Sequence, residues 1–185
     1  WKKLILLAIT MLLALLSVAG IVSFVLYQTS ISETAQRLVE TAKSNARIIE
    51  VIAQHDQSYD FLSREMHQQV LDQVKIVHEG FHIGHSGEFT LAKKEGDQIV
   101  FVMRNRLLGM DIPKSVPFEN KGLNIAEPMR RALLGESGSM IGMDYRGVRV
   151  LAAYEPVNIL NMGIVVKLDM EEIYEPYIRA GKITF

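Results

Sequence analysis

The residues His78-Glu79-Gly80-Phe81-His82 form the pattern H-E-x-x-H, in which two imidazoles and a carboxylate could hold and use a zinc ion. On a helix, the two histidines lie one turn apart and can share the metal, while the glutamate can take a proton from metal-bound water. The motif therefore raises an enzymatic hypothesis, that of a zinc metallopeptidase.

The surroundings of the motif argue against catalysis. A zinc peptidase needs its histidines on an unbroken helix and a third ligand further along the chain, but Gly80 lies inside the motif and Gly84 follows it. A glycine in a helix interior costs about 1 kcal/mol relative to alanine. We therefore predict a helix end here, with no catalytic residue, metal or cofactor in this segment. A noncatalytic metal site at His78, His82 and His85 stays an alternative.

Strand patterns follow this segment. The runs "EFTLAK" and "QIVFVMR" are separated by Glu95-Gly96-Asp97 and predict a hairpin. The next segment, through Pro113 and Pro117, is predicted to be a loop. Three further strands are expected in "SMIGMDY", "VRVLAAYEPV" and "GIVVKLD", with turns at Arg146-Gly147 and around residues 158–161.

Two helices are predicted among and after these strands. Residues 125–134 have Asn124 as a candidate cap, Glu127 at the capping-box position and Gly135 just past the end. The basic pair Arg130-Arg131 is interpreted as the solvated face of this helix. The run "MEEIYEPYIRAG" opens with acids and predicts a last helix. Consecutive strands joined by short turns imply the α+β class, with an antiparallel sheet of about five strands flanked by helices.

An apolar run near the N-terminus, "LILLAITMLLALLSVAGIVSFVL", contains no charged residue. Roughly 20 residues at about 1.5 Å rise each cross a bilayer, so residues 1–28 are predicted to form a transmembrane helix. Lys2 and Lys3 precede the run and Glu33 is the first charge after it, which places the N-terminus in the cytoplasm and the rest outside. A cleaved signal peptide is the alternative, but its apolar core is shorter. With this anchor, the zinc hypothesis becomes that of a membrane-tethered metallopeptidase.

A heptad pattern follows the span and predicts that a long helix leaves the membrane. Apolar or small residues recur in alternating steps of four and three, and the charged residues lie off this seam. Such a seam can pair with its twin in a homodimer or pack on the helix's own domain, and both interpretations are open. A second helix is predicted over residues 59–78. The seam consists of Ile31, Ala35, Leu38, Ala42, Asn45, Ile49 and Ile52.

Composition narrows the class of function. The formal net charge of −1 gives no electrostatic support for a nucleic-acid partner. The chain has no cysteine, which excludes disulfides and thiolate metal sites. Its 185 residues suffice for one domain with a proper core and a short additional element.

A set of short motifs recurs in a fixed order after the predicted helices. These motifs are Gly84 with Ser86-Gly87-Glu88, Gly135 with Ser137-Gly138, Tyr145-Arg146-Gly147, and Met162-Gly163 before Asp169. Their order and spacing resemble the Cache family, the PAS-like extracytoplasmic sensor domains of bacterial transmembrane receptors. We accordingly divide the chain after the span into an N-terminal helical region (29–80), a single Cache domain (81–180) and the start of a second membrane span (181–185).

The resemblance implies a domain that binds a small molecule and passes a conformational signal across the membrane. The receiving module, in the same full-length protein, would be of the histidine kinase, nucleotide cyclase or chemoreceptor type. The implied location is the cell inner membrane, with the sensor domain in the periplasm or outside the cell. Met162 stands where many relatives carry tryptophan, and the spaced Tyr, Arg, Trp and Asp set of the amino-acid-binding branch is not found. The ligand class is therefore left open.

A ligand pocket needs an apolar concavity with a few polar groups aimed inward. Along "QIVFVMR", strand alternation places Ile99, Phe101 and Met103 on one face. Arg104 or Arg106 could bind a carboxylate through the planar guanidinium, or could lie solvated at the strand end. We take Phe101, Met103, Arg104 and Arg106 as candidate ligand-binding residues.

Three residues of the later hairpin complete the candidate site. Tyr154 shares a strand face with Val150 and Ala152, so it either fills the core or points its hydroxyl into the pocket. Asp144 and Tyr145 lie at the hairpin end, where they either contact a ligand or are ordinary turn-flanking residues.

Overall fold

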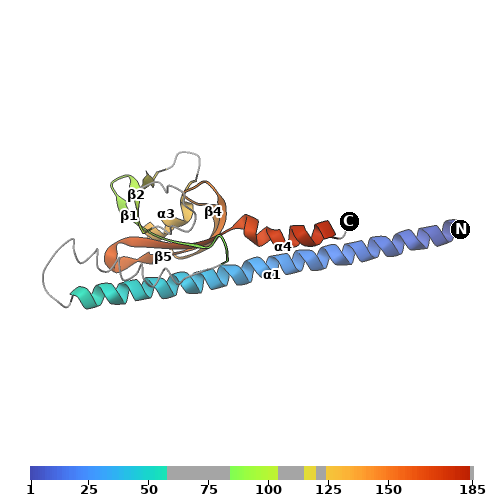
Figure 1. Cartoon of the computed structure of the whole chain (residues 1–185), viewed down its shortest axis with the longest axis horizontal. Coiled ribbons are helices and arrows are strands. Elements are labelled where there is room, and N and C mark those ends of the chain that lie inside the picture. Colours follow the sequence, from blue (N-terminus) through green and yellow to red (C-terminus); the bar gives the residue numbers. More distant parts are fainter. Residues whose placement is uncertain (58–83, 104–114, 120–123, 184–185) are drawn as a thin grey trace.

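The computed structural model describes residues 1–57, 84–103, 115–119 and 124–183. One long helix, α1 (Lys2–Gln57), runs the length of the molecule, and a curled antiparallel sheet with one short helix lies over its C-terminal part, while a further helix extends beside its middle (Figure 1). The predicted α+β class, with a long N-terminal apolar helix, is confirmed. The predicted helix over 59–78 and the H-E-x-x-H motif lie outside the described residues.

The sheet has six strands in the order β3-β2-β1-β6-β5-β4, and every neighbouring pair is antiparallel. Five of the strands follow the predicted runs. The five-strand count and the loop through Pro117 are wrong, because three residues of that segment form the edge strand β3, where a proline is tolerated. The strands are β1 (Glu88–Glu95), β2 (Gln98–Met103), β3 (Ser115–Pro117), β4 (Gly138–Met143), β5 (Arg149–Val157) and β6 (Met162–Asp169).

Helices cover both faces of the sheet, which is why β6 is almost entirely buried. Alternate residues of β6 point to opposite faces: Ile164 and Val166 pack towards α1, and Val165 packs towards α3 (Glu127–Leu133). Figure 1 shows α3 inside the curl of the sheet and α1 against its outer face. At Gly163 the strand passes so close to α3 that an added Cβ would lie 2.8 Å from the Cβ of Ala132.

The heptad seam of α1 packs on its own domain. Leu38, Ala42 and Ile49 are buried against the outer face of the sheet, so their seam positions are explained without a second chain. Asn45 lies at the edge of this contact, where its side-chain amide donates to the carbonyl of Thr41. A homodimer stays a prediction, since the structure holds one chain.

The short helix α3 is confirmed, but its predicted start and cap are wrong. It begins at Glu127, and its N-cap residue is Ala126 in the left-handed conformation without a side-chain cap bond. Pro128 explains part of this difference, because it occupies the first turn and has no N–H to be capped. At the other end, Gly135 is left-handed (φ 85°) as predicted, and its N–H donates to the carbonyl of Ala132.

The interpretation of Arg130 as a solvated side chain is also wrong. Its guanidinium donates to the carbonyl of Phe118 (2.6 Å) and to that of Ile125 (3.0 Å), and it pairs with Glu127. Arg130 thus ties α3 to the chain that precedes it, and the helix is held in one position over the sheet.

The last helix, α4 (Met170–Ile183), begins directly after β6 and runs beside α1 towards the N-terminus (Figure 1). Rings hold the two helices together: the Tyr27 ring stacks on Tyr174 at 5.7 Å and meets Tyr177 edge-on at 5.5 Å. The Tyr177 hydroxyl also donates to the carbonyl of Leu26 at 3.2 Å. α4 is therefore fixed to α1 where the apolar run of α1 ends.

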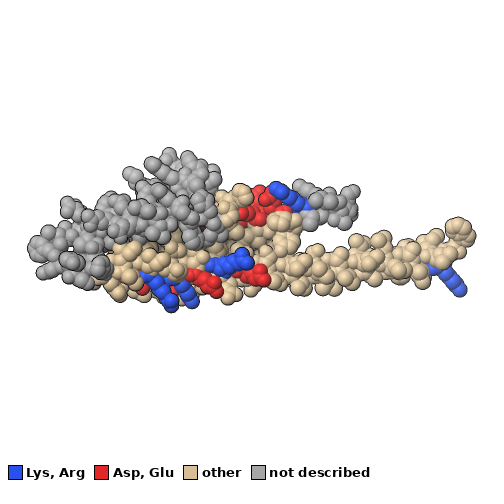
Figure 2. All heavy atoms as spheres, turned by 60° about the horizontal axis from the view of Figure 1, so that its bottom comes forward, with Lys and Arg blue, Asp and Glu red and all other residues tan. Residues whose placement is uncertain are grey.

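Among the described residues, α1 is the one helix long and apolar enough to be a candidate membrane span. Its N-terminal part projects beyond the domain, and none of the most apolar 18-residue window is buried. In Figure 2, this part of α1 is free of charge between the N-terminal lysines and the charged face beneath the sheet. Exposed large side chains over this length are stable in lipid and unfavourable in water.

Candidate functional site

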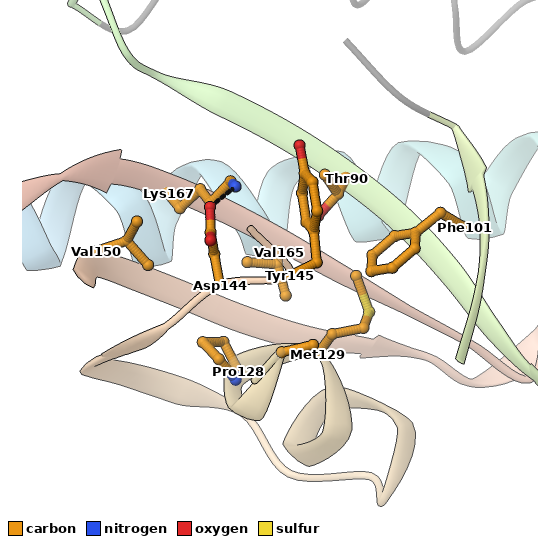
Figure 3. Close-up of a pocket in the computed structure, with 10 residues that line it drawn as sticks. Thr90, Phe101, Pro128, Met129, Asp144, Tyr145, Val150, Val165 and Lys167 are labelled. Carbon is orange, nitrogen blue, oxygen red and sulfur yellow. Dashed lines mark hydrogen bonds and ion pairs between the residues drawn. The ribbon is translucent and has the colours of Figure 1, made fainter. Parts of the chain in front are cut away.

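A small cavity lies between the inner face of the sheet and α3. Its walls are mostly apolar, and its volume is about 10 Å³, enough for about one water molecule. Asp144, Tyr145 and Lys167 form its polar side, opposite Pro128 and Met129 of α3 (Figure 3). The remaining lining residues are Thr90, Phe101, Ala126, Val150 and Val165.

The charged side of this cavity centres on Lys167, whose side chain is 1% exposed. Its Nζ pairs with Glu88 Oε2 at 2.7 Å and with Asp144 Oδ2, and it lies 4.1 Å over the ring of Tyr145. A buried ammonium without such partners would cost several kcal/mol. Two carboxylates and the negative face of a ring replace the water that Lys167 loses.

Strand register brings these groups together. Glu88 of β1 is the direct cross-strand neighbour of Lys167 of β6, so the two side chains stand side by side on the inner face. The Tyr145 hydroxyl donates to Glu88 Oε1 at 2.6 Å, and its ring lies 5.0 Å from that of Phe101. Burial is the main cause that raises the pKa of Tyr145, and the bond to Glu88 adds to it. Tyr145 therefore stays neutral and donates.

Asp144 has no acceptor position left for a ligand. Its Oδ1 accepts the backbone N–H groups of Arg146 (2.8 Å) and Val148 (3.0 Å), while Oδ2 accepts from Arg146 Nε (2.6 Å) and from Lys167. These four donors fill the approximately four lone-pair sites of a carboxylate. Burial alone would raise the pKa of Asp144, but the charges and hydrogen bonds of Lys167 and Arg146 outweigh it and lower the pKa.

The cluster extends to the start of α4 through Arg146. Its Nη2 pairs with Asp169 Oδ1 at 2.5 Å, and Asp169 is the last residue of β6 before α4. The backbone N–H of Asp169 donates to Ser86 Oγ at 3.1 Å, and Ser86 Oγ in turn donates to Glu172 Oε2 at 2.5 Å. Hydrogen bonds therefore connect the cavity wall to the first turn of α4.

Glu172 fastens that first turn to the segment before β1. Its carboxylate accepts the backbone N–H groups of His85 (2.9 Å) and Ser86 (2.8 Å). Burial raises its pKa, but these bonds and that of the Ser86 hydroxyl outweigh burial, so the pKa is lowered. Gly84 has φ 58° here, and a Cβ on it would lie 2.2 Å from Glu172 Oε1. Glycine is therefore favoured here both by the left-handed backbone and by the close approach of a carboxylate that its hydrogen bonds hold in place.

The predicted ligand residues are partly brought together. Phe101, Asp144 and Tyr145 line the same cavity. Tyr154 is buried in the same apolar cluster but is not a lining residue, and its hydroxyl lies near Gly138. A hydrogen bond with Tyr154 is the largest cause that raises the pKa of Arg131. Of its two predicted roles, Tyr154 fills the core.

The other predicted positions cannot be assigned. The side chain of Met103 and the residues Arg104 and Arg106 lie outside what the structure describes, as do His78 and His82. No group of three or more His, Cys, Asp or Glu suited to a metal is found among the described residues.

Several residues of the cluster were missed from the sequence, namely Lys167, Glu88, Arg146 and Asp169. One signal could have identified the first: Lys167 is the only charged residue inside the apolar run of β6, and lysine is almost never fully buried without a partner. No comparable signal marks Glu88, because a glutamate at a strand start is ordinary.

No protein-family model matches the chain, and no curated protein matches it. The carboxylates of Glu88, Asp144 and Asp169 are each paired with a cation. We identify no unpaired base or nucleophile in this cluster, which forms a stiff polar wall beside an apolar cavity.

Proposed function

We propose that this chain is the extracytoplasmic sensor domain of a bacterial transmembrane signalling receptor, with a PAS-like fold of the Cache type. It binds a small molecule on the inner face of its sheet and passes a conformational change to the membrane. The output module is of the histidine kinase, nucleotide cyclase or chemoreceptor type. The domain itself lies in the periplasm or outside the cell, anchored in the inner membrane by α1.

One observation supports this function most: the cavity wall and the first turn of α4 share one hydrogen-bonded cluster. A displacement of Lys167 or Tyr145 by a ligand alters Arg146, and Arg146 holds Asp169 at the start of α4. α4 in turn contacts α1 at Tyr27, next to the apolar run. A ligand can bias such a switch only if it binds one arrangement better than the other.

The cavity restricts which ligands are expected. The charges that line the cavity balance, because its charged lining residues are Asp144 and Lys167, which pair with each other. Small neutral molecules are therefore favoured over charged ones at this wall. Because the volume of the cavity is about 10 Å³, a ligand larger than water must also widen it. This widening is the conformational change by which the ligand would shift the switch.

A thermal-shift screen of the full chain in detergent tests this function. We expect a small neutral amide to raise the midpoint, because a ligand at 100 times its dissociation constant adds about 2.7 kcal/mol. Small carboxylates and divalent metals are the comparison arms. A screen in which no compound of these classes raises the midpoint would overturn the ligand role.

A matched pair of variants locates the binding. Val165 lines the cavity, whereas its neighbour Val166 is equally buried on the opposite face. Val165→Leu fills the cavity and should abolish the ligand-induced shift, while Val166→Leu should keep it. Loss of the shift in both variants, or in neither, would place the ligand elsewhere.

We also propose that the receptor is a homodimer. Ile48 and Val51 are 41% and 63% exposed on α1, turned away from the sheet, and could meet a second α1. Sedimentation equilibrium in density-matched detergent tests this, and a monomer at all concentrations would exclude the dimer.

A further inference from the structure

One end of the sheet is close to the end of the apolar run of α1. β5 runs in the same direction as α1: at its beginning, Arg149 interacts electrostatically with Tyr27, and just past its end, the N–H of Asn158 donates to Glu50 Oε1 at 3.0 Å. Tyr27 directly follows Leu26, the last residue of the uncharged run. The β4–β5 turn is therefore at the end of the domain nearest the span.

Helix and strand geometry put this turn at the level of the tyrosine contacts. Val150 pairs with Asp169, and Tyr174 lies five residues after Asp169, which is about 7.5 Å of helix rise. Val148 lies two residues before Val150, about 6.6 Å of strand in the same direction. The turn and the stacked rings of Tyr27 and Tyr174 thus extend about equally far towards the span.

The exposed surface of the turn has a mixed apolar and basic character. Met143 and Val148 are 39% and 37% exposed, and Arg149 beside them is exposed. Arg146 is paired with Asp144 and Asp169, but Arg149 forms no ion pair with another described residue. Two apolar side chains next to an unpaired guanidinium suit the boundary between acyl chains and phosphate groups.

We propose that the β4–β5 turn docks on the outer leaflet of the bilayer, with Met143 and Val148 at the acyl boundary and Arg149 on a lipid phosphate. Tyr27, Tyr174 and Tyr177 lie at the same headgroup level, where tyrosine is enriched in membrane proteins. This proposal depends on the proposed function only in requiring that α1 spans the membrane. The partner of the turn is the same bilayer that α1 enters.

The docking couples the membrane surface to the cavity. Asp144 and Tyr145, which belong to the polar side of the cavity, and Arg146, which pairs with Asp144, lie in the same turn as Val148 and Arg149. Asp144 Oδ1 holds the N–H of Val148 at 3.0 Å. Withdrawal of the turn from the lipid therefore perturbs the carboxylate that pairs with Lys167, so lipid composition should modulate the site.

Single cysteines can test the docking, because the chain has none of its own. A nitroxide is attached to Val148→Cys at the turn, to Leu16→Cys inside the span, and to Asp97→Cys in the β1–β2 turn at the far end of the sheet. The full chain is placed in phosphatidylcholine vesicles that contain phosphatidylglycerol. Collision rates with oxygen and with a water-soluble nickel chelate report lipid and water, respectively.

We expect the label at 16 to favour oxygen, the label at 97 to favour nickel, and the label at 148 to lie between them. A label at 148 as accessible to nickel as the one at 97, while the label at 16 reports lipid, would overturn the docking and leave the anchor intact. A label at 16 that reports water would overturn the membrane span itself.

A charge reversal provides an independent readout. Arg149→Glu, added to the Val148→Cys protein, should lower the docked fraction relative to the undocked about fivefold per lost charge, since a basic residue near an anionic surface contributes about 1 kcal/mol. Arg37→Glu is the control, because Arg37 is exposed on α1 ten residues after Tyr27, about 15 Å away and beyond the Debye length of about 8 Å. If both charge reversals lowered the docked fraction equally, the effect would come from the overall surface charge, and the proposed contact of Arg149 with a lipid phosphate would be overturned.

Discussion

Replacement of Lys167 by methionine tests whether the buried cluster holds the fold together. Methionine has a similar length and no charge, so the change removes the ammonium with little loss of volume. Of their partners among the described residues, Glu88 then keeps the Tyr145 hydroxyl, and Asp144 keeps Arg146 and two backbone N–H groups. Both carboxylates are left in a site from which water is largely excluded.

The expected loss of unfolding free energy is about 3 kcal/mol, the low end of the 3–5 kcal/mol range for breaking a buried ion pair. The low end applies because Asp144 keeps three of its four donors. At about 2–4 °C per kcal/mol for a chain of this size, the midpoint should fall by about 6–12 °C. Circular dichroism of the full chain in detergent measures the shift.

A double-mutant cycle with Glu88→Gln separates the charge from the packing. If the Lys167–Glu88 pair acts as described, the two losses should be non-additive by more than about 0.5 kcal/mol. The Lys93→Met variant is the control, since Lys93 is half-exposed on β1 and pairs with the exposed Glu95. A Lys167→Met protein as stable as this control would refute the reasoning.

Four further outcomes are expected. Gly84→Ala should destabilise by more than Gly96→Ala in thermal melts, because both glycines have φ near 60° but only at Gly84 would a Cβ meet Glu172; equal losses would exclude that contact. Gly163→Ala should cost about 1–3 kcal/mol by pushing α3 from β6, and Ala132→Gly should restore part of it in the double variant. Burial raises the pKa of Glu155, whose Oε2 is buried without a hydrogen-bond partner, so this residue stabilises the folded state more as the pH falls. Glu155→Gln should therefore add about 1 kcal/mol to the free energy of unfolding at neutral pH and remove this pH dependence. An unchanged profile of stability against pH would contradict this expectation. The pKa of Asp144 is lowered in the folded state, so its ionised carboxylate stabilises the fold fully above the pKa of an unfolded aspartate, about 3.9, and this stabilisation is lost as the pH falls below that value. Asp144→Asn should therefore flatten the acid side of the curve of unfolding free energy against pH, measured by urea titration.

Local patterns predicted most of the elements. Alternation along "QIVFVMR" placed Ile99 and Phe101 on the same inner face, and acids at the start of "MEEIYEPYIRAG" located α4. The uncharged run located the exposed part of α1. β3 was missed because a three-residue edge strand with a proline has no alternation of its own, and its pairing with β2 fixes it only in three dimensions.

The candidate site was harder to predict, because its described members come from five separate parts of the chain, within 88–90, 101, 126–129, 144–150 and 165–169. Asp144 and Tyr145 were identified from their place at a turn, and Phe101 from strand alternation. Glu88 meets Lys167 only through the antiparallel register of β1 and β6, which no local pattern fixes. Arg130 shows the same limit, since its burial depends on carbonyls of Phe118 and Ile125 that precede the helix.

The unbroken course of α1 determines how the molecule can move. At about 1.5 Å per residue its 56 residues form a rod of about 84 Å, and more than a third of it is clear of the sheet. Such a rod transmits tilt and rotation with little bending, because successive backbone hydrogen bonds along its interior all run parallel to the axis. The ring contact at Tyr27 divides this rod into arms of about 39 Å towards Trp1 and about 45 Å towards Gln57. If the domain rocked about that contact, Trp1 would sweep about as far as the opposite end of the rod and in the opposite direction, so the rod would act as a lever with nearly equal arms.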